Sequence, residues 1–145
     1  MTKAQQIGAT CVCFNLRRAT RAVTQLYDEA TRPAGVRVTQ FTLLSAIGSL
    51  EPVTVGRLAH AVGMDRTTLT RNLQPLSKRK LVELGPGADQ RERHISLAEK
   101  GEQTLARALP RWERAQAEMS RRLGADRLQQ LVEMLRETAT AVRAK

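Results

Sequence analysis

Residues 53–97 read VTVGRLAHAVGMDRTTLTRNLQPLSKRKLVELGPGADQRERHISL and hold the local signals that decide the fold. Thr54 precedes apolar residues spaced as on one face of a short helix, and its hydroxyl can accept a hydrogen bond from an unpaired N–H of the first turn. Gly63 stands where the chain must reverse, because glycine adopts a positive φ at little cost. The segment predicts a short helix after Thr54 that ends in a turn at Gly63 and Met64.

A second helix is expected to begin at Asp65, a residue type that is favourable at a helix N-cap. Leu69, Leu73 and Leu76 recur at the spacing of one helix face and should point into the core. The opposite face is polar, and no acidic residue occurs between Arg66 and Arg79. That face consists of Thr67, Arg71, Gln74 and Lys78, flanked by Thr68 and Thr70.

The segments at residues 81–84 and 93–97 resemble two short strands, and the turn-rich stretch between them carries Arg91. A helix, a turn, a second helix and a hairpin in this order predict a winged helix-turn-helix. The polar side chains suit a DNA major groove, because arginine can pair with guanine, glutamine with adenine, and threonine offers a hydroxyl or a methyl group. We expect duplex DNA to be the partner.

Two motifs in this stretch resemble those of the MarR family of bacterial transcriptional regulators. One is Asp89-Gln90-Arg91-Glu92-Arg93 followed by Leu97 and Gly101, which looks like the family's wing signature, and the other is Asp65 to Arg71, which resembles its recognition helix. The resemblance covers nearly the whole chain. It implies that Arg91 enters the minor groove while Asp89 holds it in place. It also implies that the major groove or its phosphates are contacted by Arg66, Thr67, Thr68, Thr70 and Arg71. The full set of expected DNA-binding residues is Thr54, Arg66, Thr67, Thr68, Thr70, Arg71, Gln74, Lys78, Asp89, Arg91 and Arg93.

Three positions depart from the family's pattern. Pro75 lies inside the expected recognition helix, where its ring crowds the carbonyl of Arg71 and removes one backbone hydrogen bond, so we expect a kink or a solvated carbonyl. Lys80 stands where the family usually ends this helix with glycine and would have to adopt a left-handed φ. Ala98 replaces a common capping threonine, which leaves Ser96 as a substitute cap.

Composition sets the fold class and the kind of partner. Of the 145 residues, 41% are hydrophobic and only 3% are aromatic, which favours one domain of close-packed helices. We therefore expect a mainly α fold with a small β-hairpin wing. The formal net charge of +10 favours a polyanionic partner. A membrane partner is discounted because no segment is long and apolar enough to span a bilayer, and without a signal peptide the protein should be cytoplasmic.

Further helices are expected on both sides of the central segment. We predict helices at residues 10–31, at 40–50 with Thr39 as its cap, at 98–123 with a bend at Pro110, and at 126–143. The apolar stripes near both chain ends exceed what the middle can cover. Residues 1–34 and 98–145 should therefore form the dimerisation region of a homodimer, with the DNA-binding lobe at residues 36–97. A two-fold dimer predicts a pseudo-palindromic operator.

Cys11 and Cys13 are candidate redox sensors. Near a helix start, and with Arg17 one turn beyond Cys13, a thiolate is favoured. In one helix the two side chains would point about 200° apart, so a disulfide would more readily join two subunits. The alternative is that both cysteines are packing residues. Only His60 and His94 could complete a metal site, so no metal or cofactor is expected.

The function expected from these signals is a sequence-specific regulator that binds double-stranded DNA. The resemblance implies a repressor that is released by a small-molecule effector or an oxidant. The alternative is a winged-helix protein–protein adaptor without sequence-specific DNA binding. No nucleophile elbow, phosphate-binding glycine loop or paired catalytic carboxylates are found, so an enzyme is not expected.

Overall fold

The structure is a computed structural model that describes residues 1–87 and 91–143. It is mainly helical, with one small antiparallel sheet whose strand order is β1-β3-β2. This confirms the expected fold class. The elements are α1 (Lys3–Thr10), α2 (Val12–Thr31), the 3-10 helix η1 (Arg32–Ala34), α3 (Val38–Leu50), β1 (Val53–Thr54), α4 (Val55–Val62), α5 (Arg66–Lys78), β2 (Val82–Pro86), β3 (Arg93–Leu97), α6 (Glu99–Leu123) and α7 (Ala125–Arg143).

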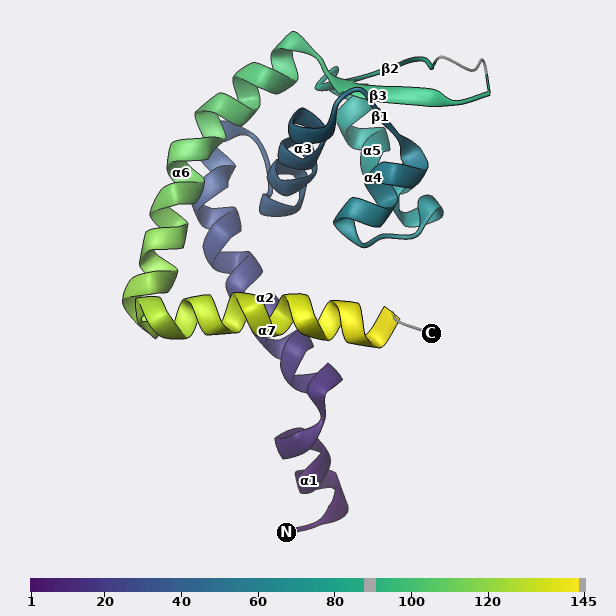
Figure 1. Cartoon of the computed structure of the whole chain (residues 1–145). Coiled ribbons are helices and arrows are strands. Elements are labelled where there is room, and N and C mark those ends of the chain that lie inside the picture. The colour runs from purple at the N-terminus through teal and green to yellow at the C-terminus, as the bar shows by residue number, and fades with distance from the viewer. Residues whose placement is uncertain (88–90, 144–145) are drawn as a thin grey trace.

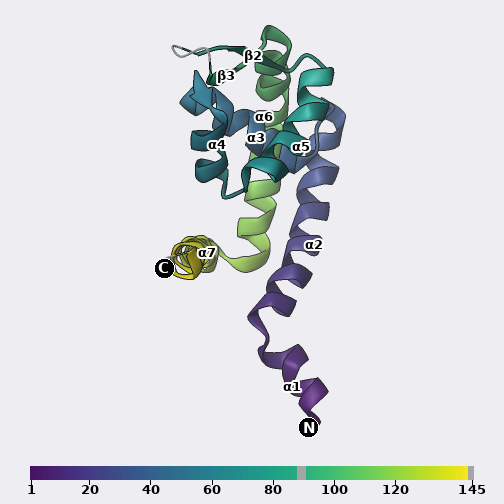
Figure 2. The same cartoon turned by 90° about the vertical axis from the view of Figure 1, so that its right-hand side faces the viewer.

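Helices α3, α4 and α5 and the sheet form a lobe beside the long helices α2 and α6, which run next to each other (Figure 1). The hairpin of β2 and β3 projects from one end of the lobe. Helix α7 turns back beneath the lobe from the end of α6, and α1 extends away from the body (Figures 1 and 2). The long helices therefore form a base on which the lobe is held.

The lobe is built around the apolar residues that the sequence pattern selects. Leu69, Leu73 and Leu76 of α5 are buried, as predicted, and pack against residues of α3, α4 and the sheet. The side chains that are wholly buried in this core are Leu44, Ile47, Leu58, Leu69, Leu76, Leu81 and Ile95. The apolar face of α5 is thus fixed to the lobe, which leaves its polar face outward.

A smaller core joins the base to the lobe. Tyr27 of α2 packs with Ala115 and Met119 of α6, and its hydroxyl donates a hydrogen bond to Gln116. Trp112 contacts both cores and stacks on Phe41 of α3, with 5.9 Å between ring centroids. Aromatic pairs at this separation add to the stabilisation that comes from burial. The base and the lobe are therefore one packed unit.

The first turn of helix α6 makes a close backbone contact with Leu81, just before the wing, that only glycine allows. Gly101 is buried, and a Cβ placed there would lie 2.0 Å from the carbonyl oxygen of Leu81. The same carbonyl accepts a hydrogen bond from the N–H of Ala98 at 3.0 Å. The start of α6 is thereby pressed against the start of β2.

The helix expected at residues 10–31 is confirmed as α2, but the separate helix α1 that precedes it was not predicted. Two expected helix caps were wrong. Thr39 does not cap α3; the N–H of Val38 donates to the carboxylate of Asp28 at 2.8 Å, a residue that is distant in sequence. Ser96 does not cap α6, whose N-cap is Ala98 with no side-chain hydrogen bond.

The left-handed conformation predicted for Lys80 is confirmed, whereas the kink expected at Pro75 and the bend expected at Pro110 stay predictions. Lys80 adopts a φ of 59°, in the left-handed region. Helix α5 continues through Pro75, and α6 continues through Pro110 as a single helix.

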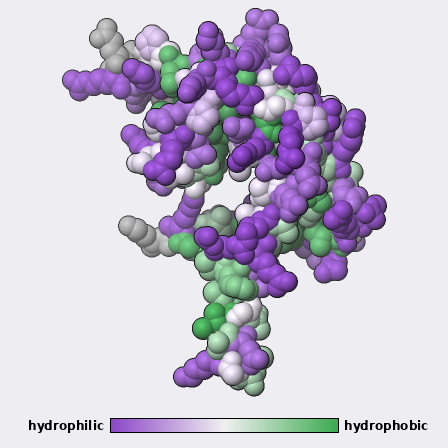
Figure 3. Space-filling model, turned by 180° about the vertical axis from the view of Figure 1, so that it is seen from behind, coloured by the Kyte–Doolittle hydropathy of each residue, from purple (hydrophilic) through white to green (hydrophobic). Residues whose placement is uncertain are grey.

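Apolar side chains remain exposed on the base. Neither α1 nor α7 contains a buried residue. The exposed apolar residues of the base include Ile7, Val12, Phe14, Leu16, Leu131, Met134, Leu135 and Val142. From behind, apolar side chains gather over α1 and the adjoining part of α2, whereas most of the lobe is hydrophilic (Figure 3). Within the described ranges, no helix has the length and hydrophobicity needed to cross a membrane.

The contact at Gly101 predicts that Gly101→Ala lowers the free energy of unfolding by about 1–3 kcal/mol, because the added methyl group must displace backbone rather than a flexible side chain. Urea denaturation at fixed protein concentration measures the change. Gly8→Ala is the matched control, since a Cβ there meets nothing within 4 Å. Equal stability of the two variants would contradict the close backbone contact between Gly101 and Leu81.

Candidate nucleic-acid interface

The first helix of the candidate reading unit, α4, is held at both ends by local signals. The hydroxyl of Thr54 accepts a hydrogen bond from the N–H of Arg57 at 3.2 Å, which caps the first turn. At the other end Gly63 has a φ of 73°, and the N–H of Met64 donates to the carbonyl of Ala59 at 2.9 Å. The predicted cap at Thr54 and the predicted turn at Gly63 and Met64 are both confirmed. The turn after α4 sets the direction in which α5 begins.

Asp65 caps α5 through two hydrogen bonds from one residue. Its carboxylate accepts the backbone N–H of Thr68 at 2.8 Å and the Thr68 hydroxyl at 2.7 Å. These bonds favour the charged carboxylate and hold the pKa of Asp65 below its ordinary value. The hydroxyl of Thr68 is therefore engaged at the cap, although the family resemblance placed Thr68 among the groove-facing residues.

The outer face of α5 carries the other expected reading side chains. Thr67, Thr70, Arg71 and Gln74 are exposed and line a shallow hollow together with Arg66. The buried leucines lie on the opposite side of the same helix. The helix is therefore oriented by its core contacts so that its arginine, glutamine and threonine side chains face outward.

A second hollow lies between α5 and the wing. Lys78 and Arg93 contribute cations to it, and Leu73 and Leu84 contribute apolar surface. Thr70 and Gln74 line this hollow as well as the one on the outer face of α5, so the two are contiguous.

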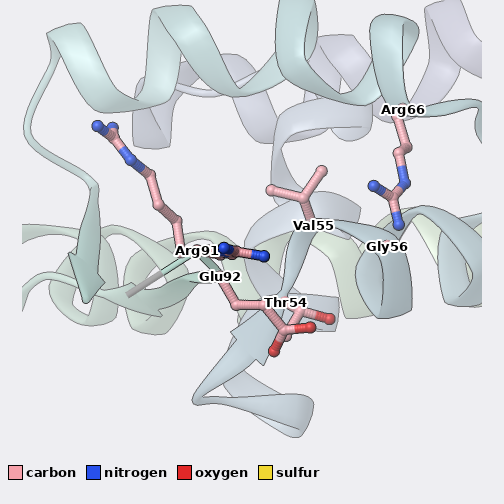
Figure 4. A pocket seen from close by; sticks show the side chains of 7 residues that line it. Thr54, Val55, Gly56, Arg66, Arg91 and Glu92 are labelled. Carbon is pink, nitrogen blue, oxygen red and sulfur yellow. The ribbon is translucent and has the colours of Figure 1, made fainter. Parts of the chain in front are cut away.

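A third hollow, of about 330 Å³, lies where the starts of α4 and α5 meet the outer end of β3 in the wing. Figure 4 shows its lining, in which the side chain of Arg66 descends from α5 toward Gly56. The other lining residues are Thr54, Val55, Arg91, Glu92 and Arg93. The three hollows share residues, so the described candidates form one continuous surface, apart from Thr68. Asp89 lies outside the described residues.

The charge of this surface is mostly positive. Within the described parts of the chain, Arg66, Arg71 and Arg93 take part in no salt bridge; those found join Glu118 to Arg121 and Arg122 in α6. Glu92 is the acidic exception among the lining residues. An arginine-rich surface of this kind suits a phosphate backbone.

The sequence did not predict five residues of the surface: Val55, Gly56, Ser77, Leu84 and Glu92. Gly56 had one detectable signal, because glycine in the first turn of a helix weakens that helix, and its presence there therefore needs another explanation. The other four residues carry no comparable signal.

The cysteines lie far along the chain from this surface. Cys11 is the N-cap of α2, where its sulfur accepts the N–H of Phe14 at 3.4 Å, and Cys13 is exposed. The backbone of Cys11 is extended rather than helical, so the geometric argument that assumed one continuous helix does not apply. Among the described residues, no cluster of three His, Cys, Asp or Glu side chains could hold a metal ion.

The two-helix unit, its outward polar face and the arginine-bearing hairpin define a winged helix-turn-helix protein. Residues 34–92 match the family model described as MarR family. The transcriptional regulator MosR of M. tuberculosis, in a crystal structure with DNA, is 39% identical, with 92% of this chain and 99% of that chain covered and a TM-score of 0.80. The chain therefore belongs to the MarR family of transcriptional regulators.

Two further solved structures are similar. A second crystal structure of M. tuberculosis MosR is 36% identical, with 92% of this chain and 98% of that chain covered and a TM-score of 0.78. The regulator PcaV of Streptomyces coelicolor, in complex with its natural ligand, is 22% identical, with 94% and 96% covered and a TM-score of 0.84. At that identity PcaV supports the fold alone.

The cap at Asp65 predicts a pH-dependent difference between the wild type and Asp65→Asn. Asparagine also caps helices but has no carboxylate to titrate. Because the folded-state pKa of Asp65 is lowered, its charge stabilises the fold above its ordinary value of 3.8, and this stabilisation is lost as the pH falls through the folded pKa. Melting temperatures measured from pH 7 downward should show the wild-type advantage shrinking below about pH 4. A constant difference across that range would contradict this role.

Proposed function

We propose that this protein is a sequence-specific repressor that binds double-stranded DNA as a homodimer. The observation that carries the proposal is the continuous, cationic surface formed by the outer face of α5 and the wing. A protein–protein adaptor would not need an arginine-rich face of this kind. Because its target is DNA, we infer a cytoplasmic location and no catalytic role.

Base reading is assigned to the outer face of α5. Arg71 and Gln74 are exposed there, and their side chains can pair bidentately with guanine and adenine in a major groove. Thr67 and Thr70 offer a hydroxyl or a methyl group beside them. Lys78, near the end of the helix, adds a cation that suits a phosphate.

The wing is assigned to the flanking minor groove. Arg91 and Arg93 are exposed toward the tip of the wing and line the hollow that connects it to α4 and α5. The family resemblance implies that Asp89 orients Arg91. Together the helix and the wing would hold the backbone between the two grooves from both sides.

A second copy of the chain would cover the exposed apolar residues of the base. Leu131, Met134 and Leu135 on α7 and Val12 and Leu16 on α2 are all more than one third exposed in the single chain. Burial of such side chains against a two-fold partner stabilises association. The two recognition helices would then enter successive major grooves about 34 Å apart, which requires a pseudo-palindromic operator.

Arg71→Ala and Arg91→Ala are expected to have different effects on DNA binding. Arg71→Ala should reduce the preference for operator over unrelated DNA by about 1–3 kcal/mol per site, because it removes a base contact. Arg91→Ala should weaken binding to both DNAs and reduce the dependence of affinity on salt. Fluorescence anisotropy with promoter DNA from beside the protein's own gene, across a salt series, measures both effects.

Arg114→Ala is the matched control, since it removes the same charge from an exposed position on α6. If Arg71→Ala and Arg91→Ala both bind like Arg114→Ala, the reading surface is misassigned. If the wild type binds no duplex at modest ionic strength, the adaptor becomes the better interpretation.

Release from DNA is assigned to a small-molecule effector or to oxidation of Cys11 and Cys13. The observation that favours oxidation is their position at the junction of α1 and α2, with Cys13 exposed. Two thiols and one organic hydroperoxide would give a disulfide, an alcohol and water, with two electrons passing from sulfur to the peroxide oxygens. Such a bond would alter the junction between the two helices of the base.

Treatment with an organic hydroperoxide should therefore lower the operator affinity of the wild type but not that of Cys13→Ser, because the variant cannot form a bond between Cys11 and Cys13. Anisotropy before and after treatment, followed by dithiothreitol, measures the loss and its reversal. Non-reducing electrophoresis shows whether the bond joins two subunits. Unchanged affinity of the treated wild type would leave the effector as the release signal.

A further inference from the structure

Gly56 touches the guanidinium group of Arg66. A Cβ at Gly56 would lie 2.7 Å from Nη2 of Arg66, 3.4 Å from its Cζ and 3.6 Å from its Nε. The guanidinium therefore lies against the bare backbone of the first turn of α4, as Figure 4 shows. Any other residue at position 56 would occupy this space.

The backbone of α4 does not itself require glycine at this position. Gly56 is the second residue of the helix, and its φ is not positive, in contrast to those of Gly35, Gly63 and Gly124. Glycine within a helix is less favourable than alanine, because it loses more conformational freedom on folding. The contact with Arg66 is thus the feature of the structure that accounts for Gly56.

The position of Arg66 separates it from the base-reading residues. Arg66 begins α5, and its side chain runs toward α4 into the hollow that also contains Thr54 and Arg93. Arg71, more than one turn later, lines only the outer hollow of α5. When α5 occupies a major groove and the wing the adjacent minor groove, the sugar-phosphate backbone that divides the two grooves passes over the hollow at Arg66.

We propose that Gly56 is a positioning residue that directs Arg66 to a DNA phosphate and away from base edges. The inference rests on the DNA binding proposed above. A guanidinium can donate two parallel hydrogen bonds to a phosphate, and Arg66 takes part in no salt bridge among the described residues. Glu92 lines the same hollow on the wing side of Thr54, where its carboxylate would repel a phosphate. The phosphate would therefore bind on the side of the hollow that holds Arg66.

Gly56→Ala tests the proposal because it displaces the Arg66 side chain without removing its charge. Operator affinity should fall about tenfold, and the slope of log affinity against log salt should become shallower by about two, one for each subunit of the dimer. The ratio of affinities for operator and scrambled DNA should stay the same. The melting temperature should stay the same or rise, since alanine favours a helix.

A double-mutant cycle with Arg66→Ala shows whether Gly56 acts through Arg66. In the Arg66→Ala background, Gly56→Ala should change affinity less than twofold, because the group that it displaces is already absent. Gly8→Ala, a helical glycine with nothing within 4 Å of its Cβ position, is the matched control and should bind like the wild type.

Three results would overturn the inference while the wild type still binds its operator. These are an unchanged affinity and salt slope in Gly56→Ala, a loss of discrimination between operator and scrambled DNA in that variant, or additive effects of the two substitutions. A wild type that binds no DNA would instead refute the proposed function, and the inference with it.

Discussion

The arrangement of the molecule depends on the backbone contact between Gly101 and the carbonyl of Leu81, where helix α6 begins against the wing. The N–H of Ala98 donates to the same carbonyl, so the start of α6 is fixed by a hydrogen bond and by the absence of a side chain. From this point α6 runs for 25 residues, which at about 1.5 Å per residue spans most of the molecule. A small change in the angle at which α6 starts would therefore displace the far end of the helix, and the base with it, much more than it displaces the start. In a dimer, the same angle sets the separation of the two recognition helices.

Contacts distributed along the chain hold the lobe to this base. Trp112 stacks on Phe41, and the carboxylate of Asp28 accepts the N–H of Val38 at the start of α3. The guanidinium of Arg143 at the end of α7 donates to the carbonyl of Gly63 in the turn before α5. A ligand that changes the position of the lobe must bind the altered arrangement more tightly than this one by at least the free energy of the contacts it breaks. The release from DNA proposed above would thus depend on the same contacts that stabilise the fold.

The parts of the structure that could be predicted from the sequence depend on neighbours within a few residues. Thr54, Gly63 and Asp65 set helix ends through bonds to the next turn, and the leucines of α5 define its buried face by spacing alone. The start of α3 depends in part on a partner outside the helix. The N–H of Val38 there donates to Asp28 of α2, and the N–H of Arg37 donates to Gln40, whereas Thr39 is not the cap. Helix α1 before Cys11 was missed because no apolar periodicity marks it. In the candidate site the residue types were predictable, but the contact of Gly56 with Arg66 joins two helices and appears only in three dimensions.

The recognition helix itself shows why its two faces can differ so much. Pro75 has no N–H to donate to the carbonyl of Arg71, and Lys80 beyond the helix adopts an unfavourable left-handed φ. Both residues are exposed, whereas Leu69, Leu73 and Leu76 are buried on the other side. Burial of three leucines contributes roughly 1.5–3 kcal/mol each, which outweighs the loss of one solvated hydrogen bond and one strained residue. The apolar face therefore keeps α5 in place, and its outer face can carry the polar side chains to which we assign the reading of the DNA major groove.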